Sequence, residues 1–481
     1  MQYLFPEKKI KYKVSNGETL RISAFFKYKK TKNNSSMKNI LILGAGLSTS
    51  NLIKYLLTNS IKYDWKIRVG DLSLDSARSK IHNHPNGTPF KFDLNDSHQL
   101  KTEIGWADAV VSMMPAFMHP LVAKECVNQG KHMLTASYVS DAMKELNHEA
   151  KQKGLALMNE LGVDPGIDHM SAMKVIHEIQ KMGGKLIGFI SNTGGLIAPE
   201  SDNNPWNYKF TWNPRNVVLA GQGGAQFLEN GQYKVIPYHR LYARARTYNV
   251  LNYGDFEMYP NRDSLKYREV YGLHDIQTLI RGTLRKAGYC KAWNVFVQLG
   301  ATDDTYKIPE SEKMTNRDFI NSFLAYDPVL SVEDKIKKEV SEANDPIVLD
   351  KLKWLGIFEN KKIELPNASP AQILQKIMEE KFKLDPDDKD MIVMQHIFDY
   401  ELKGKKFRRK SSMVIIGQDT TYTAMAITVG TPLSIATKML MTGQVKEKGV
   451  IMPIIPDIYN PILKELEEYG VKFIEEEEEL I

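Results

Sequence analysis

The sequence predicts an α/β fold in which helices cover both faces of a parallel sheet. Up to residue 160, six short apolar runs alternate with segments of helical periodicity, the pattern of consecutive βα units. The segments between these runs are too long for hairpin turns, so the strands are expected to run parallel. This alternation is typical of a doubly wound sheet of the Rossmann type.

The first run ends in a glycine turn that suits a phosphate group. Four apolar residues at 40–43 lead into the turn Gly44-Ala45-Gly46, and a helix-like segment follows. Gly44 allows a sharp turn, and Gly46 leaves room for a pyrophosphate against the backbone N–H groups at the helix N-terminus. Because Thr49 replaces the third glycine of the usual fingerprint, the turn alone is weak evidence. The predicted dinucleotide contacts here are Gly44, Ala45, Gly46, Leu47 and Ser48.

The remaining strands of this sheet follow in order along the chain. They are expected at 65–71, 91–96, 109–115, 132–138 and 154–160, with helices at 73–83 and 120–129. Ligands of such folds bind at the carboxyl edge of the sheet, where these strands end. We therefore expect Asp93 and Leu94 beside an adenine, and Met114 near the cofactor.

Asp71 closes the second strand, 25 positions beyond Gly46. A carboxylate at this distance can accept hydrogen bonds from the hydroxyls of an adenosine ribose, and it repels a 2′-phosphate. The alternative is an ordinary turn aspartate after a strand. We interpret Asp71 as the ribose ligand, with Ser73 as a neighbouring contact.

A polar loop, Asn159-Glu160-Leu161-Gly162-Val163-Asp164-Pro165-Gly166-Ile167-Asp168-His169, follows the sixth strand at the same edge of the sheet. Loops rich in Asp, Pro and Gly are most often simple turns. Asp164, Asp168 and His169 contain metal-ligating groups, but their spacing matches no standard motif. No metal is predicted, and His169 is expected to begin the next helix.

The net charge of +6 comes from the N-terminal end. Residues 1–36 contain nine basic and two acidic side chains, so the rest of the chain is close to neutral and no nucleic-acid partner is expected. No apolar run approaches the roughly 18 residues that cross a bilayer, and no membrane partner is expected. The two cysteines, Cys126 and Cys290, are too few for a disulfide framework. The cytoplasm is therefore the expected compartment.

Several stretches occur in the order found in a known family. They are Leu134-Thr135-Ala136-Ser137-Tyr138-Val139-Ser140, the loop at 159–169, Gly194-Gly195-Leu196 with Ala198-Pro199-Glu200-Ser201, Tyr208-Lys209-Phe210-Thr211-Trp212, Tyr259-Pro260-Asn261-Arg262-Asp263-Ser264, Arg281-Gly282-Thr283-Leu284-Arg285 and Val429-Gly430-Thr431-Pro432. From about residue 37 to 473, the chain resembles the saccharopine dehydrogenase family of the glutamate-forming type, also called saccharopine reductase.

The resemblance implies a homodimer and a Rossmann domain followed by an α+β catalytic domain with a helical insertion. The expected parts are a basic extension at 1–36, the Rossmann domain at 37–160, the catalytic and dimerisation domain at 161–310 and about 446–481, the inserted domain at 311–411, and a segment at about 420–445 that packs back on the Rossmann domain. Two further expectations concern local structure: a loop at 194–205, after a strand at 186–191, and a frayed acidic tail at 475–479.

The resemblance also implies a reaction. Saccharopine is a glutamate and a lysine joined through one secondary amine. A nicotinamide oxidises the lysine-side carbon next to that nitrogen, and hydrolysis of the imine gives 2-aminoadipate 6-semialdehyde and L-glutamate. Direction cannot be read from residues, so the reverse reductive condensation stays open.

Matching family positions indicates which residues act. Saccharopine carries three carboxylates, and Arg262 is the candidate for bidentate capture of one of them. Gly282 and Thr283 are candidate substrate contacts. Ser137, Tyr138 and Asp164 match positions where substrate meets nicotinamide; Tyr138 and Asp164 are the candidate catalytic residues, without assignment of the general base. Further contacts with the nicotinamide half are expected from Ala136, Ser137, Val163, Asp164, Pro165 and Asn213.

One departure from the family bears on the cofactor. Fungal members, which use NADP, have Cys-Arg-Thr after the second strand, where the arginine suits a 2′-phosphate. This chain has Asp71-Leu72-Ser73 there. We therefore predict NAD, with NADP as the alternative.

Two other functions remain open from sequence. A carboxynorspermidine dehydrogenase-like enzyme would keep the Rossmann half and alter the substrate pocket, which the Asn-Arg-Asp and Arg-Gly-Thr stretches oppose. A non-catalytic nucleotide-binding sensor would bind ligand without turnover, and the intact set of candidate site residues opposes it.

Overall fold

The computed structural model describes residues 37–480, so the basic extension expected at 1–36 lies outside the described residues. The described chain contains two sheets. The first has seven strands in the order β16-β6-β5-β4-β1-β2-β3, all parallel. Its strands are β1 (Lys38–Leu43), β2 (Trp65–Asp71), β3 (Gly87–Lys91), β4 (Ala109–Ser112), β5 (His132–Thr135), β6 (Ala156–Met158) and β16 (Gly449–Ile451).

This strand order confirms the predicted Rossmann sheet. The central strands are apolar on both faces, and β1 is fully buried from Ile40 to Leu43, because helices cover both sides of a parallel sheet. The helices between the strands are α1 (Ser50–Tyr63), α2 (Leu74–Ile81), α3 (Ser97–Trp106), α4 (His119–Asn128), α5 (Asp141–Glu145) and α6 (Asn147–Gln152). The strand expected at 91–96 is placed too late in the chain. Strand β3 ends at Lys91, and residues 92–96 form the loop before α3.

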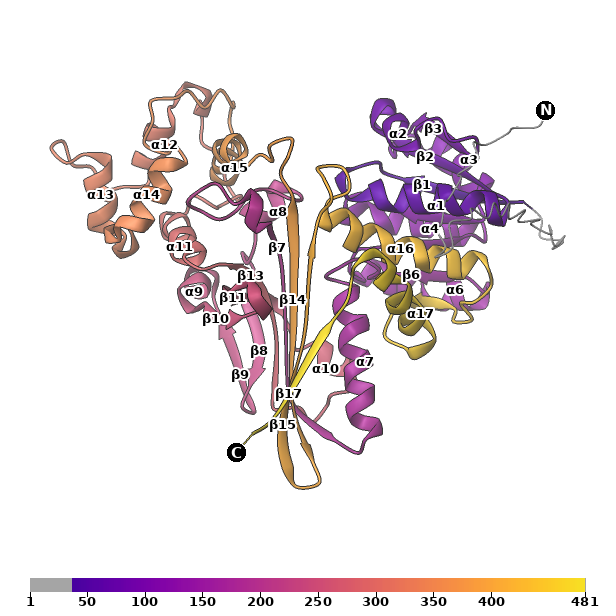
Figure 1. The fold of residues 1–481 in the computed structure, drawn as a ribbon. Coiled ribbons are helices and arrows are strands. Elements are labelled where there is room, and N and C mark those ends of the chain that lie inside the picture. The colour runs from indigo at the N-terminus through magenta and orange to yellow at the C-terminus, as the bar shows by residue number, and fades with distance from the viewer. Residues whose placement is uncertain (1–36, 481) are drawn as a thin grey trace, which may run out of the picture. The chain divides into compact units, whose positions relative to one another are not determined.

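A C-terminal helix, α16 (Ala424–Met441), packs on the first sheet's α1 (Figure 1). Gly430 makes the close approach possible, because a Cβ there would lie 2.9 Å from the Leu52 backbone nitrogen. By length and composition α16 is the one helix among residues 37–480 that could cross a membrane, and 89% of it is buried inside the protein. It is followed by β16 in the first sheet and by α17 (Pro456–Leu466), which packs on α7 and α16.

The second sheet has ten strands, seven of which follow the order β10-β11-β13-β7-β14-β15-β17. It contains β7 (Lys185–Ile197), β8 (Ala225–Glu229), β9 (Gln232–Ile236), β10 (Arg246–Asn249), β11 (Asp255–Pro260), β12 (Arg262–Asp263), β13 (Thr278–Lys286), β14 (Asp390–Leu402), β15 (Lys405–Ile416) and β17 (Ile474–Leu480). Strands β13 and β7 are parallel, and β14 and β15 pair antiparallel beside them. The helix α7 (Ile167–Lys181) leads from the polar loop at 159–169 into β7 and packs on it (Figure 1).

Helices also follow β7 and fill the segment between β13 and β14. They are α8 (Pro214–Val218), α9 (Tyr238–Leu241), α10 (Tyr267–Val270), α11 (Tyr289–Leu299), α12 (Asn316–Asn321), α13 (Val332–Glu339), α14 (Pro346–Trp354) and α15 (Pro370–Lys381). The insertion expected at 311–411 is therefore too long, because β14 and most of β15 belong to the second sheet.

Three further expectations are corrected. Strand β7 continues through Gly194 and Gly195, where a loop was expected, because β14 pairs with it as far as Ile197. The acidic tail is β17, whose glutamates lie opposite the Lys and Arg residues of β15. Because β16 joins the first sheet, residues 446–481 do not all belong to the catalytic domain.

Candidate active site

The glycine turn at the end of β1 has the geometry that a dinucleotide requires. Gly44 has a φ of 102°, and a Cβ there would lie 2.8 Å from the Met113 carbonyl oxygen, so only glycine fits. Its N–H donates to the Gly70 carbonyl at 2.8 Å. Gly46 is exposed, with no atom within 4 Å of an added Cβ. The space on this side of the turn fits a pyrophosphate.

Asp71 is bound to the same turn. One carboxylate oxygen accepts a hydrogen bond from the Ala45 N–H at 2.7 Å, and the other accepts from the Ser73 N–H at 2.9 Å. Ser73 caps α2 by accepting from the Ser76 N–H. The acid at the end of β2 therefore also supports the turn, which the sequence did not reveal.

The other predicted cofactor residues follow strand ends of the first sheet, which places them on the carboxyl edge together. Leu47 and Ser48 begin the short helix after the turn, Asp93 and Leu94 follow β3, Met114 follows β4, Ala136 and Ser137 follow β5, and Val163, Asp164 and Pro165 follow β6. Asn213 comes from the other half of the chain. Its side chain caps α8, accepting from the Arg215 N–H at 2.9 Å, which leaves its amide nitrogen for other contacts.

Tyr138 and Asp164, the predicted catalytic pair, are in direct contact. The Tyr138 hydroxyl donates to an Asp164 oxygen at 2.8 Å. The Arg281 guanidinium donates to the same Asp164 oxygen at 2.6 Å and to Asp168 at 2.6 Å. Burial, followed by the neighbouring Asp164 carboxylate, raises the pKa of Tyr138 well above its usual value. Tyr138 therefore stays protonated and acts as a donor near neutral pH.

Arg281 is the principal residue of the candidate site that was not predicted from the sequence. It lies on β13 of the second sheet, and it is 6% exposed. Its guanidinium carbon is also 4.3 Å from the centre of the Tyr267 ring. Because two carboxylates already neutralise Arg281, it orients Asp164 instead of offering a free cation to a substrate. The Arg-Gly-Thr motif contains it, but sequence spacing gave no sign that it reaches the loop after β6.

A second buried network lies behind this pair. His169 bonds Glu160 through Nε2 at 2.6 Å and the Tyr271 hydroxyl through Nδ1 at 2.5 Å. Glu160 also accepts from the Val139 N–H at 2.9 Å. Burial alone would raise the pKa of Glu160, but the hydrogen bond with His169 moves it below its usual value. The network joins α7, the loop after β5 and α10, and it fixes the loop that carries Asp164.

Ser137 is held by a buried histidine. His119 Nε2 lies 2.7 Å from the Ser137 hydroxyl, and its Nδ1 lies 2.9 Å from the Ser112 hydroxyl. Burial lowers the pKa of His119 to about 4, so the ring is neutral at pH 7. A lone histidine at the start of a helix carried no signal in the sequence.

Two cations lie near the Tyr138 ring on the solvent side. The Arg262 guanidinium carbon is 5.9 Å from the ring centre, and Lys266 Nζ is 5.2 Å from it. Both side chains are exposed, and Arg262 has a φ of 51°. Within residues 37–480 neither forms an ion pair with an acidic side chain. They are available for an anionic ligand.

Gly282 and Thr283 lie on β13 beyond Arg281. A Cβ on Gly282 would clash with the Met258 side chain and lie 2.8 Å from Asn192 Oδ1, so this position is filled by neighbouring groups. Side chains alternate along a strand, so Thr283 shares the face of Arg281. Thr283, but not the Gly282 position, can therefore present a side chain to a substrate.

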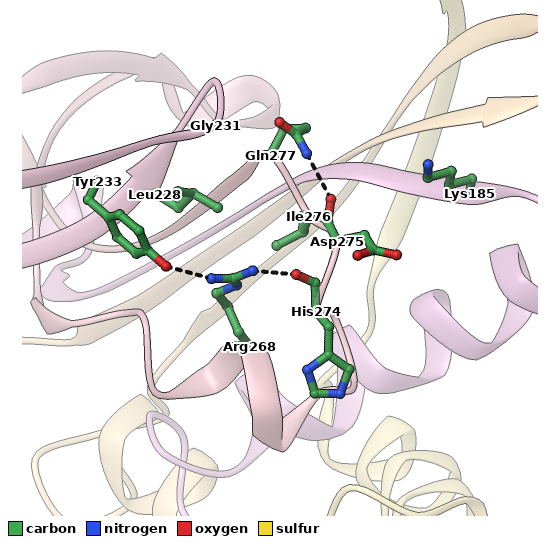
Figure 2. A pocket seen from close by; sticks show the side chains of 9 residues that line it. All are labelled: Lys185, Leu228, Gly231, Tyr233, Arg268, His274, Asp275, Ile276 and Gln277. Atoms are coloured by element: carbon green, nitrogen blue, oxygen red, sulfur yellow. Dashed lines mark hydrogen bonds between the residues drawn. The ribbon is translucent and has the colours of Figure 1, made fainter.

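A polar hollow of ≈ 410 Å³ lies elsewhere on the second sheet (Figure 2). Figure 2 shows Arg268 donating to the Tyr233 hydroxyl and to the His274 carbonyl at this place. None of the predicted site residues lines it. The candidate site is thus defined by its hydrogen-bonded side chains. No group of three metal-ligating side chains occurs among the described residues.

These features define a class of protein. Strands β1–β6 in the order 3-2-1-4-5-6, a turn open to a pyrophosphate and an acid at the end of β2 are the framework of dinucleotide-binding enzymes. The family model of the Saccharopine dehydrogenase NADP binding domain matches residues 40–158. That of the Saccharopine dehydrogenase C-terminal domain matches residues 162–471. The chain belongs to the saccharopine dehydrogenase family.

The similarity to curated relatives extends over nearly the whole chain. The chain is 36% identical over 446 residues to saccharopine dehydrogenase (NADP(+), L-glutamate-forming) of Pyricularia oryzae, covering 90% of this chain and 98% of the relative. The enzyme of the same name from Saccharomyces cerevisiae is 34% identical, with 90% and 98% covered. The mitochondrial alpha-aminoadipic semialdehyde synthase of Rattus norvegicus is 34% identical over 91% of this chain and 48% of the relative.

A solved structure agrees with the fold. The apo histidine-tagged saccharopine dehydrogenase (L-Glu forming) from Saccharomyces cerevisiae matches with a TM-score of 0.84 at 32% identity, covering 92% of this chain and all of that one. The resemblance stated from sequence is confirmed, and the chain has a nicotinamide-binding domain. The fungal relatives are named for NADP(+), so they give no support to the predicted preference for NAD.

Proposed function

We propose that this protein oxidises saccharopine with a nicotinamide cofactor to 2-aminoadipate 6-semialdehyde and L-glutamate, or catalyses the reverse condensation. The observation that supports it best is the hydrogen-bonded set Tyr138, Asp164 and Arg281 beside Arg262 and Lys266, two cations that pair with no acid in the described part of the chain. The names of the relatives favour this activity over a carboxynorspermidine dehydrogenase or a non-catalytic sensor.

Each part of this set has a role in that chemistry. Arg262 and Lys266 bind carboxylates of the substrate, and Asp164, held by Arg281, accepts a hydrogen bond from the secondary amine. A nicotinamide held at the carboxyl edge of the first sheet would supply the acceptor for the hydride on the carbon next to the nitrogen. Tyr138, whose hydroxyl is protonated at neutral pH, then donates toward the departing amine nitrogen, and Asp164 accepts the proton that the attacking water gives up. Ser137 is positioned by the neutral ring of His119.

The proposal is tested by following absorbance at the reduced nicotinamide band. Saccharopine with NAD or NADP should give a rise that depends on both components. Glutamate should appear in equal amount. No rise with either cofactor would overturn the proposed function, and a rise without glutamate would point to another oxidation.

NAD is the cofactor that Asp71 supports. Its carboxylate stands at the end of β2, fixed by the Ala45 and Ser73 N–H groups, where a 2′-phosphate would meet its negative charge. The names of the fungal relatives oppose this choice. This chain has Asp71-Leu72-Ser73 where fungal members have Cys-Arg-Thr. The expected preference for NAD therefore follows from the residues of this chain and not from the cofactor of those relatives.

Substituting this acid tests the preference. We expect kcat/KM to be higher with NAD, and Asp71→Ser to improve NADP relative to NAD by about tenfold or more, since one charge repulsion of about 1.4 kcal/mol is removed. The matched control Asp75→Ser, an exposed acid on the neighbouring helix α2, should leave the ratio unchanged. A wild-type preference for NADP, undisturbed by Asp71→Ser, contradicts the assignment.

We further propose that the protein is a cytoplasmic homodimer. The resemblance to the family supports the dimer, and two buried free thiols, Cys126 and Cys290, support a reducing compartment. Light scattering of the purified protein and localisation of a tagged chain test the two statements separately.

A further inference from the structure

Arg285 is a buried cation that no acidic side chain neutralises within residues 37–480. It is 3% exposed, and three tyrosine rings surround it: its guanidinium carbon is 5.2 Å from the ring centre of Tyr208, 5.4 Å from Tyr289 and 5.8 Å from Tyr259. One of its nitrogens donates to the Leu284 carbonyl, and Nε has no partner. A buried charge in this state is costly unless a ligand pairs with it.

The acid nearest in register does not serve Arg285. Glu257 lies opposite it on β11, but its two oxygens accept from the N–H groups of Gly288 and Cys290. Arg281, four residues earlier on the same strand, is held by Asp164 and Asp168. Within residues 37–480, the buried Arg281 is therefore paired with two acids, whereas the buried Arg285 has no counter-ion.

Other buried polar groups without partners gather at the same place. The hydroxyls of Tyr208, Thr211 and Thr193 are buried and make no hydrogen bond. The Tyr208 ring contacts the Arg285 guanidinium. Thr193 lies opposite Thr283 in the parallel pair β7 and β13. A Cβ on Gly195, two residues beyond Thr193, would lie 3.3 Å from the Thr211 hydroxyl. Buried polar atoms are normally satisfied, so a cluster of orphans beside an unpaired cation indicates a ligand.

The arrangement on β13 connects this cluster with the active site. Side chains at every second position of a strand share a face, so Arg281, Thr283 and Arg285 lie on the same face of β13. Tyr138 and Asp164 lie at the Arg281 end of this face. Four residues of strand span about 13 Å. The lysine arm of saccharopine has six bonds from the secondary amine nitrogen to its carboxyl carbon, about 7 Å when extended, and an arginine side chain adds about 6 Å between its Cα and its guanidinium carbon, from bond lengths near 1.5 Å. Together these two lengths cover the distance from the Arg281 end of this face to Arg285.

We propose that Arg285 binds the α-carboxylate on the lysine side of saccharopine, with the hydroxyls of Thr193, Thr211 and Tyr208 accepting from the neighbouring α-ammonium. This inference rests on the proposed function. Arg262 and Lys266, near Tyr138, are left for the two carboxylates on the glutamate side. The lysine arm is the longer one measured from the reacting nitrogen, so it is the arm that reaches away from Tyr138 toward Arg285.

A substrate that lacks one carboxylate tests the assignment directly. N-(5-aminopentyl)-L-glutamate keeps the reacting carbon, the secondary amine, the distal ammonium and both glutamate carboxylates, and lacks only the lysine-side carboxylate. The wild-type enzyme should use it with a kcat/KM ten- to a hundredfold below that of saccharopine, the loss expected for a charged hydrogen-bonded contact.

The variant Arg285→Met should lose ten- to a hundredfold in kcat/KM on saccharopine and little on the shortened substrate, with the KM for the cofactor unchanged. Arg285→Lys should fall between. Arg246→Met, on the edge strand β10 and paired with Glu229, is the matched control and should treat the two substrates as the wild type does.

Each outcome is decisive. An equal loss on both substrates for Arg285→Met would assign Arg285 a structural role and overturn the proposal. If neither Arg285 variant folds, the comparison of the two substrates on the wild-type enzyme still tests the proposal. Equal use of saccharopine and the shortened substrate would overturn the proposal as well. Failure of the wild-type enzyme to oxidise saccharopine at all would instead overturn the proposed function.

Discussion

At the scale of single residues, the charge balance around Asp164 depends on Arg281. Two carboxylates share this guanidinium in a buried position, and removing one partner of such a pair is costly, about 3–5 kcal/mol. Arg281→Met should therefore lower the free energy of unfolding by that amount. It should also reduce kcat, while the KM for the cofactor should change less. Denaturant unfolding and steady-state kinetics measure both.

The conservative variant separates charge from geometry. Arg281→Lys keeps the charge but reaches only one carboxylate well, so we expect it to recover most of the stability and little of the kcat. Loss of stability without loss of kcat in both variants would contradict the positioning role of Arg281.

His119 gives the site a pH dependence in stability. Its pKa is lowered by burial from 6.5 to about 4, so the unfolded chain binds more protons between these values. The stabilisation is fully present above pH 6.5 and is lost as pH falls toward 4, by about 3 kcal/mol at most. His396 shifts in the same direction, so the two act together.

A neutral substitute isolates the contribution of this histidine. His119→Asn should lower the free energy of unfolding at pH 7 and flatten its decline between pH 6.5 and 4. Denaturant titrations at several pH values measure the slope. An unchanged slope in the variant would contradict a neutral, buried His119.

At the scale of elements, the packing of α16 against α1 controls the glycine turn. An added Cβ at Gly430 would lie 2.9 Å from the Leu52 nitrogen and 3.1 Å from the Ser48 carbonyl, and backbone atoms cannot yield as a side chain can. Gly430→Ala should destabilise the protein by about 1–3 kcal/mol and raise the KM for the cofactor. Thermal unfolding and kinetics test both effects.

Gly105 in α3 provides the matched control. A Cβ there would meet only the end of the Gln129 side chain. Since alanine is a better helix former than glycine, Gly105→Ala should leave the KM unchanged and the stability equal or slightly higher. A similar response of the two variants would argue against a specific α1–α16 contact.

The elements differ in how far sequence could predict them. Strands β1, β4 and β5 are apolar and each is followed by a helix, so their type and order could be read directly. The apolar end of β15, from residue 412, also reads as a strand, but its charged first half and β17 could not be predicted, because each carries a run of like charge that is typical of a solvated segment. Their charges are compensated only across the pair, as between Arg409 and Glu477 at 2.7 Å.

The same limit applies to the site. Candidate cofactor contacts at strand ends, such as Gly46 and Asp71, could be selected from their position in a βα unit, and these assignments stay predictions. Arg281, Arg285 and His119 could not, because their roles arise where segments distant in sequence meet. No local pattern distinguishes a buried arginine that pairs with Asp168 from one that pairs with no acid.

At the scale of the whole molecule, the cofactor-binding sheet is completed by the C-terminal part of the chain. Strand β16 extends the sheet beside β6, and α16 covers α1. A chain ending at residue 420 would leave the apolar faces of α1 and β6 uncovered. We expect this truncation to lose cofactor binding, measured by calorimetric titration with the reduced nicotinamide, and to expose apolar surface to a fluorescent dye.

A chain ending at residue 473 is the control, because it lacks only β17, the outer strand of the second sheet. Its loss removes Glu479, the partner of Lys405, and Glu477, one of the partners of Arg409, but leaves β16 and α16 in place. We therefore expect it to bind the cofactor with an affinity within a few-fold of the full chain. Wild-type affinity in the shorter chain that ends at 420 would show that the first sheet is stable alone, and the dependence on α16 would be wrong.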